Sequence, residues 1–128
     1  MAFDNTTAAK RILDNTLSED AILAISIMDI NGTILASKSK QSFREKFGST
    51  RDGEKYGGSL AVAVLSLVNE VKDVVGEAQA IITIHDNCKL MLLPMLSYRL
   101  LIGLVVKRSV NVEDDYFTSK LKNIIGSS

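Results

Sequence analysis

The segment of residues 59–75, SLAVAVLSLVNEVKDVV, constrains the fold of this chain more than any other. Its spacing predicts a helix, with Ser59 as the N-cap and Gly76 just past the C-terminal end. One stripe is apolar along the whole helix, and the first half is apolar on the opposite side as well. The stripe consists of Leu60, Val64, Leu67, Val68, Val71 and Val75, and the opposite side of Ala61, Val62, Ala63 and Leu65.

A helix that is apolar all round must be covered all round. The chain has 128 residues, which fit one domain, 1–128. In a domain this small, one face of the helix can lie on a sheet. We expect the other face to be covered by a second copy of the chain, so the sequence predicts a homodimer.

The segments around this helix predict an antiparallel sheet. Short apolar runs, rich in Ile, Leu and Val, are typical of buried strands. Asn31-Gly32 between the first two runs favours a type I′ hairpin turn. The expected strands are 21–28, 33–37, 78–85, 89–96 and 100–107, and the expected flanking helices are 5–17 and one that begins at Asn111.

The predicted order is α-β-β-α-β-β-β-α, with a five-stranded antiparallel sheet flanked by helices, an α+β fold. Residues 38–58 are polar and contain four glycines. We expect a helical turn at 42–47 and loop over most of the rest. Connections of this length are uncommon in compact domains and are often either mobile or functional.

Charge and hydropathy exclude several classes of protein. The formal net charge is zero, from 15 basic and 15 acidic residues, which argues against nucleic-acid binding. Residues 90–106 are mostly apolar, but Pro94 and Arg99 interrupt them, so two strands fit better than a membrane span. The N-terminus has no apolar core of a secretory signal, and there is one cysteine. We expect a cytoplasmic protein without membrane insertion.

The one histidine and the one cysteine, His85 and Cys88, lie three residues apart. They could ligate a metal or form a base and nucleophile pair, but a zinc site needs three or four ligands. Asp86 and Asn87 between them are typical of a turn. We therefore expect a hairpin tip, with no catalytic residue, no metal site and no cofactor.

Four basic residues of the 38–58 connection could form a patch for an acidic partner. Acidic residues alternate with them, so a solvated loop is the competing interpretation. The glycines there lack the GxxxxGK[ST] spacing of a phosphate-binding loop. The candidate partner-binding residues are Arg44, Lys46, Arg51 and Lys55.

The order of elements carries a resemblance to a known family. The stretches that carry it are AILAISIMDINGTILAS, the apolar helix that leads through GEAQAIITIHDNCKLMLLPM, and YRLLIGLVVKRSVNVEDD before the final helix. Together these stretches resemble the roadblock/LC7 family, a branch of the profilin-like folds, and most of all its small stand-alone archaeal members. The 38–58 connection departs from the family, in which it is usually shorter.

The resemblance implies a protein that is not an enzyme. It implies dimerisation through the 59–75 helix and the 78–85 strand, often with one continuous sheet, and regulation or scaffolding of a small Ras-like GTPase. The alternative function is a profilin-like domain that senses a small ligand in a pocket between sheet and helix. The residues expected at the dimer interface are Leu60, Ala61, Val62, Val64, Leu65, Val68, Ala80, Ile82 and Ile84.

Overall fold

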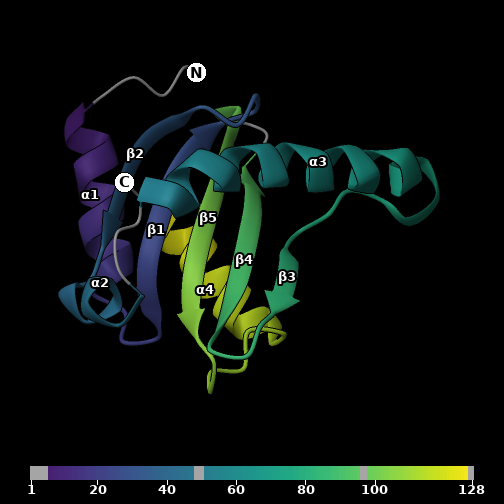
Figure 1. Cartoon of the computed structure of the whole chain (residues 1–128). Coiled ribbons are helices and arrows are strands. Elements are labelled where there is room, and N and C mark those ends of the chain that lie inside the picture. The colour runs from purple at the N-terminus through teal and green to yellow at the C-terminus, as the bar shows by residue number, and fades with distance from the viewer. Residues whose placement is uncertain (1–5, 48–50, 96–97, 127–128) are drawn as a thin grey trace.

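A computed structural model describes residues 6–47, 51–95 and 98–126 of the chain. Its strands form one sheet, and helices lie on both faces of that sheet (Figure 1). The elements are α1 (Thr6–Leu17), β1 (Ile22–Asp29), β2 (Ile34–Ser39), α2 (Gln41–Phe47), α3 (Arg51–Val75), β3 (Ile81–Ile84), β4 (Cys88–Met95), β5 (Leu100–Lys107) and α4 (Asp115–Gly126).

The sheet has five strands in the order β2-β1-β5-β4-β3, and every neighbouring pair is antiparallel. The α+β class and the antiparallel five-stranded sheet predicted from the sequence are confirmed. The two edges of the sheet are β2 and β3, so the strand that follows α3 has a neighbour on one side only.

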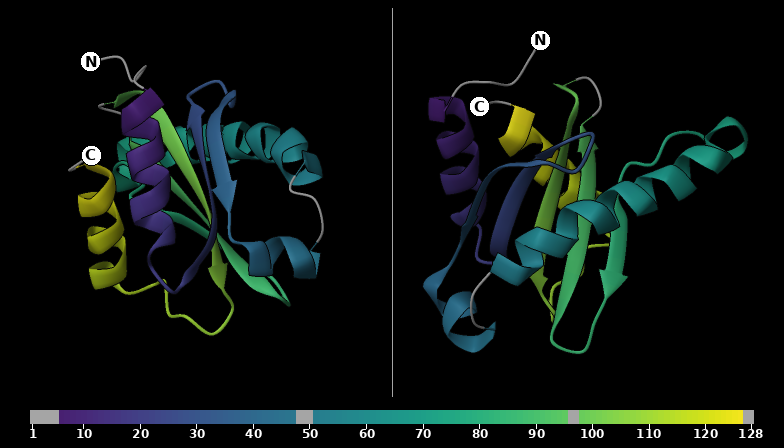
Figure 2. Two further views of the ribbon diagram at one scale, coloured as in Figure 1. Left: turned by 90° about the vertical axis from the view of Figure 1, so that its left-hand side faces the viewer. Right: turned by 45° about the horizontal axis from the view of Figure 1, so that its top comes forward.

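Each face of the sheet supports a separate apolar core. The larger core lies under α1 and α4, which stand side by side on one face (Figure 2). It takes alternate residues of the central strands, such as Ile25, Met91 and Ile102, because successive side chains of a strand point to opposite faces. The smaller core lies under α3 on the other face, around Met28 and Leu101.

The β1–β2 turn differs from the predicted type I′ turn. The Gly32 amide donates to the Asp29 carbonyl (3.0 Å), and Gly32 has φ 85°. Among the described non-glycine residues only Arg99 has a positive φ, so Asn31 lacks the backbone that type I′ requires. The Asp29 carboxylate accepts hydrogen bonds from the Asn31 and Thr33 amides instead, and a glycine-terminated turn results.

The region 38–58 is mostly helical, so the expected loop is wrong. β2 continues to Ser39, α2 covers residues 41–47, and α3 already begins at Arg51. Ser59 consequently lies inside α3 and is not its N-cap. Glycine disfavours a helix by about 1 kcal/mol per residue, but once a helix exists each added residue gains a hydrogen bond. At the other end, Gly76 follows α3 with φ 86° and donates to Lys72, as predicted.

The two hairpins after α3 agree with the sequence analysis. His85 donates its backbone amide to the Cys88 carbonyl (2.9 Å), so Asp86 and Asn87 form the expected turn. Pro94 pairs with Leu101 of β5 but lies beyond the last residue of β4 that pairs with β3. Proline has no amide hydrogen to donate, and at Pro94 the β3 side of β4 has no partner strand that would need one.

The last helix begins four residues later than predicted. Asn111 and Asp114 both use a side-chain oxygen to accept a backbone amide two residues on. Asp114 is the effective cap of α4, since its carboxylate binds the Tyr116 amide and its carbonyl binds the Phe117 amide.

Candidate interaction surface on helix α3 and strand β3

Helix α3 packs on one end of the sheet. Ala61 and Leu65 of the helix belong to the smaller core, with Ile81, Leu92 and Leu101 of the strands below. All three strand residues lie toward the same end, where β4 finishes and β3 and β5 begin. The helix therefore crosses the sheet near this end and then passes over its β3 edge.

The second half of α3 projects beyond the sheet (Figures 1 and 2). Every described residue from 69 to 77 is exposed. We call residues 67–75 the projecting half. It carries four exposed apolar side chains: Leu67 (65% exposed), Val71 (48%), Val74 (87%) and Val75 (74%).

These four apolar residues share one side of the helix. They occur at i, i+4, i+7 and i+8, which is the spacing of a single helical stripe. At about 100° per residue, the stripe is rotated by roughly a third of a turn from Ala61 and Leu65, which face the sheet. It thus lies along the flank of α3, where a second helix on the same sheet would contact it. Contiguous exposed apolar surface of this kind marks interaction sites.

At the other end of the sheet, α2 lies on the α3 face and contacts β1, and the parts of β3, β4 and β5 beyond it form a more exposed surface (Figure 2). By alternation from Leu92 and Ile81, the side chains of Leu90, Cys88 and Thr83 point to this face. Val105 pairs with Leu90 and lies beside it. We call this set, with His85, the open sheet surface: Thr83, His85, Cys88, Leu90 and Val105. Its members are half-buried or exposed.

Strand β3 lies between these two surfaces. Its four residues pair with β4 in the register Ile81↔Leu92 to Ile84↔Lys89, and its outer edge is unpaired. Ile84 at the end of the strand is 54% exposed. An unpaired edge offers backbone donors and acceptors to a strand of another chain.

Four of the predicted interface residues pack inside their own chain. Ala61 is 7% exposed and Leu65 packs beside it in the smaller core. Ala80 and Ile82 pack against the larger core, on the face that carries α1 and α4. Their apolar character is therefore accounted for by the fold of a single chain.

The other predicted interface residues have different positions. Val62, Val64 and Val68 are half-buried on α3, and Ile84 is exposed at the edge. The side chain of Leu60 lies outside the described residues.

The most exposed apolar residues of α3 were absent from the predicted interface. Leu67, Val71 and Val75 belonged to the apolar stripe seen in the sequence, but the predicted interface was drawn mainly from the first half of the helix, which is apolar on two sides. The continuation of the stripe to Val75 is the signal that could have identified them.

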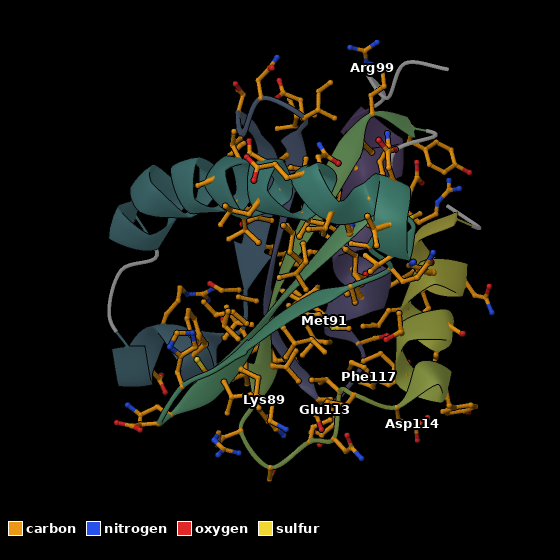
Figure 3. All side chains as sticks on the ribbon, turned by 90° about the vertical axis from the view of Figure 1, so that its right-hand side faces the viewer. Lys89, Met91, Arg99, Glu113, Asp114 and Phe117 are labelled. Carbon is orange, nitrogen blue, oxygen red and sulfur yellow. The ribbon has the colours of Figure 1, made fainter. Side chains whose placement is uncertain are left out.

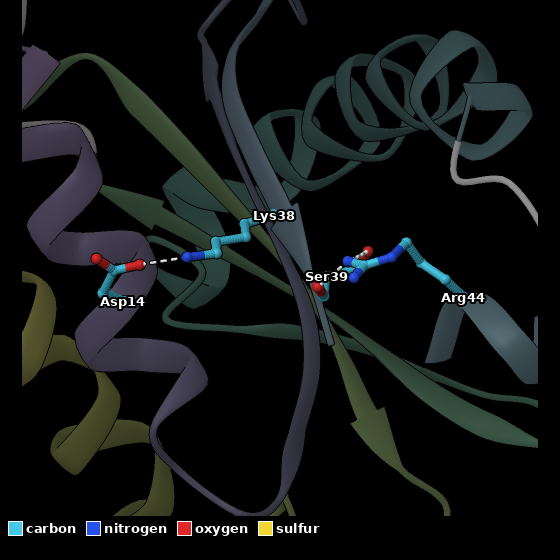
Figure 4. A network of polar contacts seen from close by, with 4 residues as sticks. All are labelled: Asp14, Lys38, Ser39 and Arg44. Carbon is cyan, nitrogen blue, oxygen red and sulfur yellow. Dashed lines mark hydrogen bonds and ion pairs between the residues drawn. The ribbon is translucent and has the colours of Figure 1, made fainter. Parts of the chain in front are cut away.

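The four basic candidates do not form a described patch. Arg44 donates through Nη1 to the Ser39 carbonyl and to the Ser39 hydroxyl (3.2 Å for the latter), which ties α2 to the end of β2 (Figure 4). Lys46, Arg51 and Lys55 lie in helices, but their side chains are outside the described residues.

The polar surface of the chain is held by ion pairs far from the projecting half. Lys38 Nζ lies 2.7 Å from Asp14 Oδ1 and joins β2 to α1 (Figure 4). This hydrogen bond lowers the pKa of the Asp14 carboxyl below its ordinary value of 3.8. The hydrogen bond from Lys107 lowers the pKa of Asp20 in the same way.

His85 and Cys88 belong to the open sheet surface and do not form a reactive pair. His85 Nε2 lies 2.9 Å from the Thr83 hydroxyl. Burial raises the pKa of the Cys88 thiol, which reduces the thiolate available for nucleophilic attack or metal binding. Within the described part of the chain, no three His, Cys, Asp or Glu side chains gather as a metal site would require.

None of the described helices combines the length and apolar character needed to cross a membrane.

Comparison with known proteins gives matches in structure. The sequence matches no protein-family model and no curated protein. The gliding protein MglB of Thermus thermophilus superposes with a TM-score of 0.71 at 15% identity, covering 100% of this chain and 97% of that one. A roadblock/LC7 domain from Streptomyces avermitilis gives 0.68 at 9% identity, covering 91% and 90%. MglB of Myxococcus xanthus gives 0.68 at 13% identity, covering 99% and 92%.

These likenesses extend over nearly the whole of each chain and concern its architecture. They agree with the five-stranded antiparallel sheet and the flanking helices described above. The fold of this chain is the roadblock/LC7 fold.

Proposed function

We propose that this chain is a non-catalytic homodimeric interaction module that regulates or scaffolds a small Ras-like GTPase. The dimer is supported by the exposed apolar stripe on the projecting half of α3, together with the unpaired edge of β3. The GTPase comes from the resemblance to the roadblock/LC7 family. A solved MglB structure that shares this fold at 17% identity is described as a tetrameric arrangement, and assembly of that protein from several copies supports the proposal.

The size of the apolar stripe supports a stable contact. Complete burial of a Val or Leu side chain contributes about 1.5–3 kcal/mol. A symmetric dimer buries the same set twice, because the same patch of both chains faces the partner. Association costs about 4–15 kcal/mol in lost freedom, so two stripes together can offset it, and backbone pairing along β3 would add to the contact.

The dimer is tested by size-exclusion chromatography with light scattering. We expect a mass of twice 13.9 kDa at micromolar concentration. Val74→Glu places a charge on the most exposed apolar position of the projecting half, so it should leave the single chain folded and split the dimer. An unpaired buried charge costs about 3–5 kcal/mol, which weakens association by about 100-fold or more.

The matched control for Val74→Glu is Ser66→Glu. Ser66 is also exposed on α3, on the side away from the apolar stripe, and the change introduces the same charge. This variant should keep the mass of a dimer. A wild-type chain that runs as a monomer, or a Val74→Glu chain that remains dimeric, would contradict the proposed interface.

The GTPase partner is tested by affinity capture from native cells, with the chain immobilised as a dimer. We expect a small Ras-like GTPase to be retained, in amounts that differ between extracts supplemented with GDP and with a non-hydrolysable GTP analogue. Retention of no GTPase under either condition would remove this part of the proposal and leave the homodimer as a scaffold.

A further inference from the structure

The turn between β4 and β5 holds an arginine in a backbone conformation that suits glycine. Arg99 has φ 57° and is the one non-glycine residue in the described part of the chain with a positive φ. In residues other than glycine and asparagine, this conformation brings the Cβ atom too close to a neighbouring carbonyl oxygen. Strained residues of this kind cluster at functional sites. Glycine would give a more stable turn, so the arginine itself requires an explanation.

The side chain of Arg99 has no role in holding its own chain together. Arg99 is exposed, and no hydrogen bond or ion pair joins its guanidinium to another described residue. It extends beyond the end of the sheet, at the opposite end from Lys89 and Glu113 (Figure 3). All the donors of the guanidinium are therefore available to another molecule.

An acidic residue lies close to Arg99 along the sheet but is engaged elsewhere. Asp29 of β1 pairs with Leu100, the residue that follows Arg99. Asp29 Oδ1 accepts hydrogen bonds from the backbone amides of Asn31 (2.8 Å) and Thr33 (3.0 Å). The carboxylate is thus directed into the β1–β2 turn, and the positive charge of Arg99 stays without a counterion from that turn.

We propose that Arg99, together with its neighbour Tyr98, is an anchor by which this chain binds a surface carboxylate of its small GTPase partner. A planar guanidinium can bind a carboxylate through two parallel hydrogen bonds. Arginine and tyrosine are enriched among the few residues that dominate binding energy, and Tyr98 is 36% exposed beside Arg99. This inference rests on the proposed function and specifies which residue contacts the GTPase.

Stability and binding should respond in opposite directions to Arg99→Gly. Glycine removes the backbone strain, so the urea midpoint of unfolding should rise, while the mass from light scattering should stay that of wild type. Arg108→Gly is the matched control, because Arg108 is an exposed arginine at the other end of β5 without a positive φ. The control should not raise the midpoint.

Binding is measured first by affinity capture from native cells with wild type, Arg99→Gly and Arg108→Gly, and then by calorimetry with the purified GTPase. Wild type and Arg108→Gly should bind alike. Arg99→Gly should bind at least about 30-fold more weakly, as expected on truncating an arginine that dominates an interface. Arg99→Lys keeps the charge but loses the planar fork, so it should also bind more weakly than wild type.

A double-mutant cycle identifies the carboxylate on the GTPase. Its surface Asp and Glu residues are replaced singly by Asn and Gln. The replacement of the carboxylate that contacts Arg99 should weaken binding to wild type and have little further effect on binding to Arg99→Gly. The absence of any such coupled residue would overturn the proposed contact.

The other outcomes separate this contact from the proposed function. A GTPase that binds wild type and Arg99→Gly equally, or is weakened equally by Arg99→Gly and Arg108→Gly, overturns the role of Arg99 and leaves the GTPase partner in place. Unchanged affinity with slower GTP hydrolysis would mean that Arg99 acts on the nucleotide phosphates, which also overturns it. A midpoint that does not rise in Arg99→Gly overturns the premise that the arginine is kept at a cost. A wild-type chain that retains no GTPase overturns both proposals.

Discussion

At the scale of single residues, one buried polar group of the described chain lacks the hydrogen bond that such groups normally make. Thr16 of α1 is fully buried, and its hydroxyl is the one side-chain polar atom buried in the described residues without a hydrogen-bond partner. Buried polar groups normally have partners, because a missing hydrogen bond costs about 1–3 kcal/mol. The side chain of Thr16 therefore contributes buried packing, but its unpaired hydroxyl lowers the free energy of unfolding.

Replacing Thr16 with valine tests this cost. Valine has nearly the same shape and no hydroxyl, so Thr16→Val should raise the free energy of unfolding by about 1 kcal/mol. Urea denaturation followed by circular dichroism measures the change, and Thr33→Val at an exposed position serves as control. A loss of stability would mean that the hydroxyl has a bound partner, which would favour the alternative of a ligand-sensing domain.

The ion pair of Lys38 with Asp14 makes stability depend on acid pH. The pKa of Asp14 is lowered in the folded chain, so its contribution is present above the ordinary value of 3.8 and is lost as the pH falls through the lowered value. In Lys38→Met the thermal midpoint should change less over that acid range than in wild type. An equally steep acid dependence would show that the Lys38–Asp14 pair does not affect the stability. Arg108→Met, which removes an exposed charge that does not act on Asp14, is the control.

At the scale of elements, the sequence predicts strands better than the extent of helices. Five strands and their order along the chain follow from apolar runs and turn residues, because burial on both faces leaves a clear signal. The start of α3 was mistaken by eight residues, since its first turns contain glycines and polar side chains. The same limit applies to the interface residues: periodicity shows that α3 is apolar on two sides but not which part of the helix projects beyond the sheet.

One buried lysine fixes the segment that precedes α4 to the sheet. Lys89 of β4 is buried, and its Nζ donates to the Val110 carbonyl at 2.7 Å, with Glu113 Oε1 at 3.9 Å (Figure 3). These contacts hold the segment between β5 and α4 against the β3–β4 hairpin. A lysine buried in this way is uncommon unless it is paired.

Removing this amine should loosen the attachment of α4. Lys89→Met keeps the aliphatic stem and leaves the Val110 carbonyl without its donor, which costs about 1–3 kcal/mol of stability. Chemical denaturation measures the loss, and hydrogen exchange should increase in α4 more than in β1. Lys122→Met removes an exposed bond to Gln79 (2.9 Å) from the same helix and should cost much less. Equal losses in the two variants would contradict a special role for Lys89.

At the scale of the whole molecule, the proposed dimer contact consists of apolar surface and backbone pairing, whereas the ion pairs of the described residues lie elsewhere. Lys38–Asp14, Lys89–Glu113, Lys107–Asp20 and Lys120–Glu19 join segments of one chain. None of them involves the projecting half of α3 or strand β3. Association and single-chain stability therefore respond to different solution conditions.

Salt concentration distinguishes a dimer held by apolar contacts from a dimer held by ion pairs. Raising sodium chloride to about 1 M shortens the screening length to about 3 Å, so a dimer held by charges would dissociate. We expect the mass from light scattering to remain that of a dimer at this salt concentration, since the four stripe residues are apolar. A monomer at high salt would instead indicate an interface that depends on ion pairs.

The projecting half of α3 also connects the abundance of this protein to its lifetime. Every described residue from 69 to 77 is exposed in the single chain, so nothing but the helix itself protects that backbone. At low expression the chain would be alone, so the end of the helix would fray and proteases could cut it. In the proposed dimer, which forms at higher expression, a second chain would cover the same segment and turnover would slow. The cell would then retain this protein only above a threshold of synthesis, with no dedicated regulator required.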